Sequence, residues 1–224
     1  MAINNLDNPV WHALTGPHLV HAIGHGLARH YPTDMAPFSA IADASDAAYA
    51  DLAHDLPPRT EARLFRSSEE PLPRGWDHVD CFPMLQMVAI AAPHLASDAV
   101  TLLGETDTPA MMDLVAIAKP GPFGVRTPAL GCYVGVREGS RLLAMAGERM
   151  RLPGYVELSG ICVHPVARGR GYAAALTAYL MRMALARGET PFLHVRPDNT
   201  AVALYNRLGF ETRRELVVLW RRPL

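Results

Sequence analysis

The stretch of sequence that decides the fold is Val163-His164-Pro165-Val166-Ala167-Arg168-Gly169-Arg170-Gly171-Tyr172-Ala173. An apolar strand ends at the proline, a turn with two arginines and two glycines follows, and a helix rich in alanine and leucine begins directly after it. Free N–H groups at a helix start and the helix dipole favour an anion, and glycine lets a phosphate approach the backbone closely. Arginine adds paired donors that match phosphate oxygens. The sequence therefore predicts an anion-binding cradle made of Arg168, Gly169, Arg170, Gly171, Tyr172 and Ala173.

Two further motifs follow the cradle. An apolar strand is expected at 192–195, and residues 199–210 read Asn-Thr-Ala-Val-Ala-Leu-Tyr-Asn-Arg-Leu-Gly-Phe. The pattern Arg168-x-x-Gly171-x-Ala173 resembles the pyrophosphate-binding signature of the GNAT acetyltransferase superfamily. The 199–210 run resembles the segment that closes the cofactor site in that family. The resemblance covers residues 97–224 and implies an α/β (α+β) GNAT fold, a mixed and mostly antiparallel sheet flanked by helices.

Composition excludes several classes of function. Half of the 224 residues are hydrophobic and the formal net charge is −1, so the chain can bury a core and lacks the basic surface that nucleic-acid binding favours. The longest apolar run, 84–93, is too short to cross a bilayer, and residues 1–7 do not resemble a signal peptide. Cys81, Cys132 and Cys162 form no C-x-x-C pair, which is typical of free thiols in a reducing compartment. We therefore expect a cytoplasmic enzyme that binds neither nucleic acid nor membranes.

The chain divides into two regions near residue 96. Residues 1–96 are rich in His, Pro and Asp, show no clear site, and are a candidate for a degenerate GNAT-like half that packs on the C-terminal sheet. Residues 97–224 form the predicted GNAT domain. The N-terminal region is expected to contain helices from residue 8 to 30 and over 45–56 (after a Ser45 N-cap), and strands over 38–42, 61–65 and 84–91. The C-terminal region is expected to contain strands over 99–103, 130–136, 142–150, 155–163, 192–195 and 215–220, and helices over 107–119, 173–187 and 200–208.

The resemblance assigns the other cofactor contacts. In GNAT enzymes the central strand splays from its neighbour, so that the pantetheine arm of acetyl-CoA pairs with its backbone. By position this implies Ile161, Cys162 and Val163, one of whose N–H groups would face the oxyanion. Gly160 beside them suits a β-bulge. Asn199 is expected to cap the last helix, and the resemblance adds a contact to the cofactor arm.

Three residues are candidates for proton transfer. Tyr205 matches the family tyrosine that protonates the departing thiolate, the alternative being a tyrosine that fills the core. Glu157 and Glu148 are candidate general bases, because a carboxylate in an apolar sheet environment has a raised pKa. The alternative for each is an exposed or paired strand residue. His164 is a further candidate of lower rank.

Two other chemistries are disfavoured. Cys162 as an acyl-accepting nucleophile lacks a His–Asp arrangement to activate it, so a buried small side chain is favoured. His18, His21 and His25 share a face of the predicted helix, and His21 and His25 have the i, i+4 spacing of metal ligands. No Glu stands beside His21 and no further ligand of this pair is identifiable, so we expect no metal.

The acceptor side is expected at the Pro- and Gly-rich loop over residues 120–127, where the resemblance places the acceptor wall. Phe123 could pack on the acceptor and Arg126 could pair with an acceptor carboxylate. The alternative is a stiff connecting loop.

These features predict an acetyl-CoA-dependent N-acetyltransferase in which a primary amine attacks the thioester directly in a ternary complex. The C-terminal region resembles the branch that includes glycine N-acyltransferase-like proteins. The acceptor is expected to be a small-molecule amine or an amino acid, with a protein N-terminus ranked lower, and a homodimer is one option. The main alternative is a non-catalytic CoA-binding or regulatory module on the same fold. A P-loop protein is disfavoured, because no Gly-Lys-(Ser/Thr) follows the turn.

Overall fold

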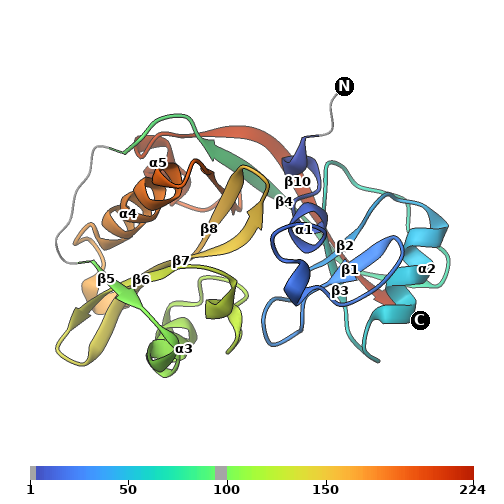
Figure 1. Cartoon of the computed structure of the whole chain (residues 1–224), viewed down its shortest axis with the longest axis horizontal. Coiled ribbons are helices and arrows are strands. Elements are labelled where there is room, and N and C mark those ends of the chain that lie inside the picture. Colours follow the sequence, from blue (N-terminus) through green and yellow to red (C-terminus); the bar gives the residue numbers. More distant parts are fainter. Residues whose placement is uncertain (1–3, 94–99) are drawn as a thin grey trace.

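One mixed sheet organises the molecule (Figure 1). The computed structural model describes residues 4–93 and 100–224. Within them, eight strands form a sheet in the order β3-β10-β4-β9-β8-β7-β6-β5, and β1 and β2 form a separate antiparallel pair. The strands are β1 (Ala28–His30), β2 (Ser39–Ile41), β3 (Ala62–Arg66), β4 (Trp76–Ala89), β5 (Thr101–Leu103), β6 (Tyr133–Glu138), β7 (Arg141–Leu152), β8 (Tyr155–Val163), β9 (Thr190–Val195) and β10 (Phe210–Pro223). The helices are α1 (Pro9–Leu14), α2 (Asp46–Asp55), α3 (Thr108–Ala118), α4 (Tyr172–Ala186) and α5 (Val202–Arg207).

The sheet forks between β8 and β9. These two strands pair in parallel, but only through Tyr155–Glu157 and Thr190–Phe192. Every other strand pair in the sheet is antiparallel, so the predicted mixed and mostly antiparallel sheet is confirmed. Beyond the fork, β9 stays in the sheet because its other edge pairs with β4. The C-terminal half of β8 therefore has one edge without a strand partner among the described residues.

The N-terminal region is built into this sheet. Strand β4 lies between β9 and β10, and β3 forms the edge beyond β10. The boundary predicted near residue 96 thus divides the chain but not the sheet. Strand β4 is longer than the predicted 84–91 strand because its first part continues to pair with β10, down to Trp76 opposite Pro223.

Helices cover both faces of the sheet (Figure 1). Helices α4 and α5 pack on one face, where Leu176 and Leu180 meet Leu158 and Leu193. Helix α3 packs on the opposite face through Met111 and Leu114. Helix α1 and the β1–β2 region cover the other end of that opposite face, which also contains Phe65 and Phe192.

Local sequence signals predicted most of the helices. Ser45 caps α2 by accepting a hydrogen bond from Ala48 N at 3.2 Å, as expected. Helix α4 lies within one residue of its predicted bounds and is followed by Gly188 at φ +76°. The helix predicted through residues 18–30 is wrong, because Gly24 and Gly26 adopt positive φ values of +114° and +50° and lead into β1. The strand predicted over 99–103 falls partly outside the described residues and is observed as β5. None of the helices within residues 4–93 and 100–224 has the length and apolar character that a bilayer crossing requires.

Candidate active site

The fork opens into a cavity of about 730 Å³. Its walls come from both faces of the sheet, so the cavity passes through the gap between β8 and β9. On the side of α4 and α5 it is lined by Ile161, Val163, Arg168, Ala173, Leu193, Asn199, Leu204 and Tyr205, among others, and Cys162 of the same strand faces the α3 side. On the opposite side it is lined by Phe38, Arg63, Phe65, Phe82, Met84, residues 118–122, Arg149, His194 and Val218.

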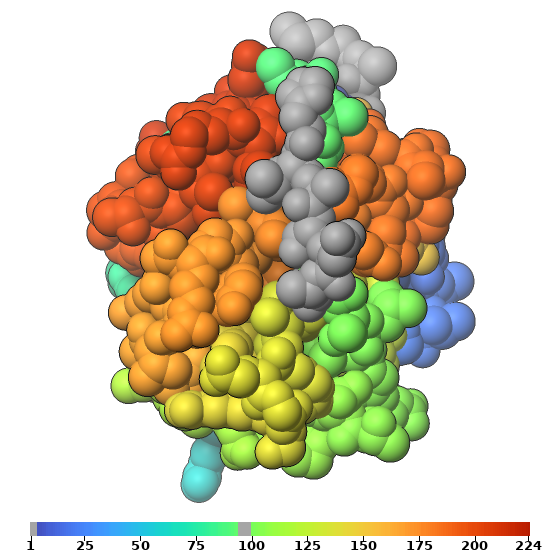
Figure 2. Space-filling view, turned by 90° about the vertical axis from the view of Figure 1, so that its left-hand side faces the viewer, coloured from blue at the N-terminus to red at the C-terminus, as the bar shows by residue number. Residues whose placement is uncertain are grey.

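The cradle lies at the surface beside this cavity. Arg168 and Ala173 line the cavity, and the residues between them form an exposed turn that leads into α4. Figure 2 shows this part of the chain in orange on the surface, beside the yellow hairpin between β6 and β7. Because Gly171 precedes the first residue of α4 and offers no side-chain cap, the first N–H groups of the helix have no acceptor in their own helix.

Backbone conformation explains the two glycines of the cradle. Gly169 and Gly171 have φ values of +79° and +78°, which L side chains rarely adopt. A Cβ built at either position meets no atom within 4 Å, so both point into open space. The surface turn therefore combines a left-handed backbone, exposed Arg168 and Arg170, and room for an anion against the main chain.

Strand β8 presents free backbone groups to the cavity. Gly160, at φ +62°, coincides with the register shift opposite β7, so the predicted bulge is confirmed. His164 N donates to Leu143 O on β7 at 2.7 Å. Because N–H groups alternate along a strand, Val163 N–H points away from β7, toward the fork. Cys162 is opposite Met145 and 7% exposed, and burial raises the pKa of its thiol to about 12.

Tyr205 and Asn199 reach the cavity from the last helix and the turn before it. Tyr205 is 8% exposed and burial raises its pKa to about 12, so the phenol keeps its proton at neutral pH. Its ring packs edge-on against Phe210, with ring centroids 6.1 Å apart. Asn199 Oδ1 accepts a hydrogen bond from Ala201 N at 2.8 Å, in the turn before α5. The N-cap of α5 is Ala201 without a side-chain bond, so the expectation that Asn199 caps this helix is wrong.

Glu157 is engaged in a buried ion pair. It is fully buried, and Arg149 donates to it through Nε (2.8 Å) and Nη2 (2.6 Å). His194 Nδ1 lies 2.8 Å from the same carboxylate. Burial raises the pKa of Glu157, but Arg149 and His194 outweigh it and lower the pKa to about 2. The raised pKa predicted for Glu157 is therefore wrong, because the apolar sheet supplies it with a counter-ion.

Gln86 determines the tautomer of His194. Gln86 Oε1 accepts from Arg213 at 2.8 Å, and Nε2 donates to Leu6 O at 2.8 Å. The amide orientation is thereby set, and Nε2 also lies 3.2 Å from His194 Nε2. With the Gln86 amide as donor, His194 Nε2 accepts this bond and Nδ1 donates to Glu157. Both ring nitrogens of His194 are occupied.

Glu148 lies on the other face of β7 and does not line the cavity. Its carboxylate is 2.5 Å from Arg187 Nη2 and 3.2 Å from Arg151 Nη2, and it accepts from Cys132 N at 3.2 Å. Glu148 is therefore a paired strand residue, which was the alternative to a general base, and it lies outside the cavity. His164 also has a partner, since Arg141 Nη2 lies 2.7 Å from its Nε2.

The residues of the 120–127 loop that line the cavity differ from the two that the sequence predicted. Lys119 and residues 120–122 line the cavity, whereas Phe123 and Arg126 do not. Phe123 packs edge-on against Tyr133, at a centroid distance of 5.7 Å. Arg126 is half exposed and lies 3.6 Å from Asp34. The backbone N–H of Arg126 also donates to the backbone O of Asp34 at 3.0 Å, and this bond connects the loop to the N-terminal region.

Sequence reasoning missed the walls that residues 1–96 provide. The sequence shows no clear site in this region, but Phe38, Arg63, Phe65, Phe82 and Met84 line the cavity. No local motif marks these positions. Arg149 was also missed, although a charged residue within the apolar strand run 142–150 signals a buried partner.

Known proteins with similar sequences or structures agree with this geometry. A structure from Novosphingobium aromaticivorans, described as an acetyltransferase of the GNAT family, has a TM-score of 0.91 and 36% identity and covers 99% of this chain and 100% of that chain. The family model for FR47-like protein matches residues 133–219. This chain belongs to the GNAT acetyltransferase family. No curated protein matches the sequence.

More distant structures share the fold alone. A GNAT acetyltransferase from Colwellia psychrerythraea is 18% identical, covers 65% of this chain and 58% of that chain, and has a TM-score of 0.52. A protein of unknown function from Staphylococcus epidermidis is 14% identical, covers 73% of each chain and has a TM-score of 0.54.

Proposed function

We propose that this chain is an acetyl-CoA-dependent N-acetyltransferase that acetylates a primary amine. The observation that carries the proposal is the single cavity that contains the cradle's Arg168 and Ala173, the free edge of β8 and Tyr205. Family membership supports acetyl transfer as the reaction.

The residues around the cavity fit acetyl-CoA as co-substrate. The cradle offers backbone N–H groups, two arginines and open space above Gly169 and Gly171 for a pyrophosphate. The free N–H of Val163 and that of Ile161 suit a polar arm that lies along β8, with a hydrogen bond available to the thioester oxygen. Acetyl-CoA supplies a thioester, whose C–S bond breaks as the amine nitrogen bonds to the carbonyl carbon.

Two protons must move in this reaction. Tyr205 is proposed to donate one to the departing thiolate sulfur, since its raised pKa keeps it protonated, and to regain it from solvent. Among the described residues no carboxylate lines the cavity. We therefore propose that the amine loses its proton to water, and that Glu157 acts by holding Arg149 in place.

A second candidate function is a CoA-binding module without catalysis. It is supported by the same observation, because none of the described carboxylates lines the cavity and a general base is therefore missing there. We also propose that the chain belongs to the glycine N-acyltransferase-like branch, prefers the acetyl group, is located in the cytoplasm and forms a homodimer. The free cysteines are consistent with a reducing compartment.

Two measurements test the proposal. Acetyl-CoA should raise the melting temperature, because a ligand of the native state stabilises it. Free thiol should then be released in the presence of an amine from a panel of amino acids, amino acid amides and polyamines. No thermal shift at millimolar acetyl-CoA would rule out both candidates, and a shift without turnover of any amine would favour the non-catalytic module.

A further inference from the structure

The charge in the cavity has one sign. None of the carboxylates of residues 4–93 and 100–224 lines it. Five cationic side chains do: Arg63, Lys119, Arg149, Arg168 and Arg196. Arg168 belongs to the cradle. Arg63 and Arg149 lie on the opposite side of the fork, beyond the free edge of β8, where an acceptor would enter.

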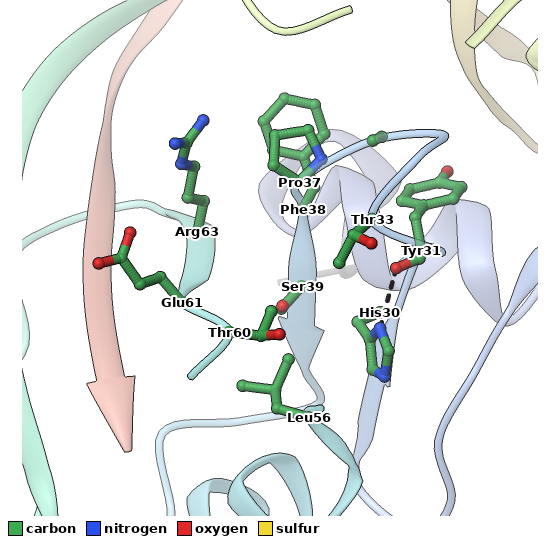
Figure 3. Close-up of a pocket in the computed structure, with 11 residues that line it drawn as sticks. His30, Tyr31, Thr33, Pro37, Phe38, Ser39, Leu56, Thr60, Glu61 and Arg63 are labelled. Carbon is green, nitrogen blue, oxygen red and sulfur yellow. Dashed lines mark hydrogen bonds between the residues drawn. The ribbon is translucent and has the colours of Figure 1, made fainter. Parts of the chain in front are cut away.

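Arg63 has no close ion-pair partner among the described residues: burial lowers the pKa of its guanidinium, and the more distant charge of Glu61 opposes this only in part. Its guanidinium stacks on the ring of Trp220, with Cζ 3.9 Å from the ring centroid. No described carboxylate forms an ion pair with it, since Glu61 accepts from Trp220 Nε1 at 2.5 Å and lies 4.0 Å from Arg222. Figure 3 shows the Arg63 guanidinium at the same end of a smaller neighbouring pocket as the Phe38 ring, with Glu61 directed elsewhere. Arg63 and Phe38 border both that pocket, of about 160 Å³, and the main cavity.

Arg149 offers a second donor in the same compartment. Its Nε and Nη2 are taken by Glu157, and Nη1 has no hydrogen-bond partner in the part of the chain that the structure describes. Cζ lies 4.6 Å from the centroid of the Phe38 ring. The fully buried Glu157 holds this guanidinium in one orientation.

The wall between these arginines is apolar and aromatic. Phe38 and Phe65 pack edge-on at a centroid distance of 5.3 Å, and Phe65 lies 4.6 Å from the His194 ring. Phe82 and Met84 extend the wall along β4. Arg149 and Arg196, which are paired with Glu157 and Asp198, already stack on Phe38 and Phe82. The faces of these two rings are therefore taken by guanidinium groups and do not offer a cation site to the acceptor.

We propose that the acceptor is an amine that also carries a carboxylate and an apolar body, as an α-amino acid with a hydrophobic side chain does. The carboxylate binds Arg63, with Arg149 Nη1 as second donor, and the apolar body packs on Phe38 and Phe65. This inference rests on the proposed acetyltransferase function. It excludes polyamines and other polycationic amines as good acceptors.

Matched acceptors test the proposal in the wild-type protein. Phenylalanine and leucine are compared with their carboxamides and with spermidine, by the rate of free thiol release from acetyl-CoA. The amides contain a less basic amine, so more of it is unprotonated and intrinsic reactivity favours them. We nevertheless expect kcat/KM to be at least about 10-fold higher for the acids, because a charge-assisted pair with arginine forms only with a carboxylate.

Variants at position 63 test whether Arg63 causes the preference for acids over amides. Arg63→Gln should lower kcat/KM for the acids by about 10- to 100-fold, mainly through KM, and for the amides by less than about 3-fold. Arg63→Lys, which keeps the charge, should retain more activity toward the acids than Arg63→Gln. Arg222→Gln removes a half-exposed arginine outside the cavity and should change neither. The KM for acetyl-CoA and the melting temperature serve as folding controls.

The other outcomes overturn the inference in distinguishable ways. If the amides or spermidine react as well as the acids, or if Arg63→Gln slows both classes equally, Arg63 does not select a carboxylate, and the acetyltransferase proposal stands. If acetyl-CoA binds but no amine of either class reacts, the inference fails and the non-catalytic module is favoured. If acetyl-CoA does not bind, both proposals fail.

Discussion

The two ends of the cavity are built in different ways. At the proposed cofactor end, residues 160–173 and 199–205 form two short continuous segments, and the groups they offer are mostly backbone N–H groups. At the proposed acceptor end, side chains arrive from Phe38, just before β2, and from β3, β4, β7, β9 and β10, and the central group is the buried Arg149–Glu157 pair. Backbone recognition depends on local conformation, which short motifs specify. Side-chain recognition here depends on the order of strands in the sheet.

Breaking the buried pair gives the largest expected effect. Glu157→Gln removes the carboxylate and leaves Arg149 buried without its counter-ion, which should reduce the free energy of unfolding by about 3–5 kcal/mol. Chemical denaturation measures it. Glu138→Gln is the control, since that carboxylate is exposed and 4.0 Å from Arg170, and it should change stability by less than about 0.5 kcal/mol. A loss below about 1 kcal/mol for Glu157→Gln would mean that Arg149 is neutralised by another group.

The pH dependence of this effect follows from the pKa of Glu157. Burial raises that pKa, but Arg149 and His194 lower it to about 2 from an ordinary value of 4.5. The pair therefore stabilises the fold fully above about pH 4.5, and the contribution is lost as the pH falls from there toward 2. The stability gap between wild type and Glu157→Gln should accordingly be constant above pH 5 and close in acid. A gap that stayed constant down to pH 2.5 would contradict this assignment.

At the cofactor end, Gly171→Val should lower acetyl-CoA affinity by at least about 100-fold, because a β-branched residue disfavours φ +78° and its side chain enters the open space above the turn. Calorimetric titration measures the affinity. Gly154→Val imposes the same strain at φ +82° in the turn between β7 and β8, outside the cavity, and should leave binding unchanged. Equal affinity in both variants would place the pyrophosphate elsewhere.

Tyr205→Phe tests the chemistry where the two ends meet. Phenylalanine keeps the packing on Phe210 and removes the proton donor, so kcat should fall by about 10- to 100-fold while acetyl-CoA affinity stays within about 2-fold. Tyr179→Phe, on α4 outside the cavity, should leave kcat unchanged. An unchanged rate in Tyr205→Phe would reduce this tyrosine to a core residue, and parallel losses of rate and affinity would indicate a packing role.

Arg126→Gln should have the smallest effect. Arg126 pairs with Asp34 at 3.6 Å and does not line the cavity, so kcat/KM for any acceptor should change by less than about 3-fold. The contrast with Arg63→Gln separates the acceptor wall predicted from the sequence from the one proposed from the cavity lining. A loss of 10-fold or more in Arg126→Gln would restore the loop arginine as an acceptor contact.

The local backbone at the proposed cofactor end could be predicted because its signals are local. Positive φ at Gly169 and Gly171, the bulge at Gly160 and the start of α4 each follow from residue types within one turn or one strand. The raised pKa predicted for Glu157 was wrong because it depends on contacts between residues on different strands. Its pKa depends on Arg149 across a strand pair and on His194 across the fork, and no spacing in the sequence records either contact.

The sequence by itself determined the GNAT fold, the cradle, and the position of Tyr205 on the last helix, because hydrophobic periodicity, glycine conformation and helix ends act over a few residues. Only the tertiary structure decided that β4 enters the sheet between β9 and β10. That insertion brings Phe82 and Met84 to the cavity, and the pairing of β3 with β10 brings Arg63 and Phe65. The physical reason is that strand order sets which side chains meet, and strand pairing over more than a hundred residues is selected by the packing of the whole core.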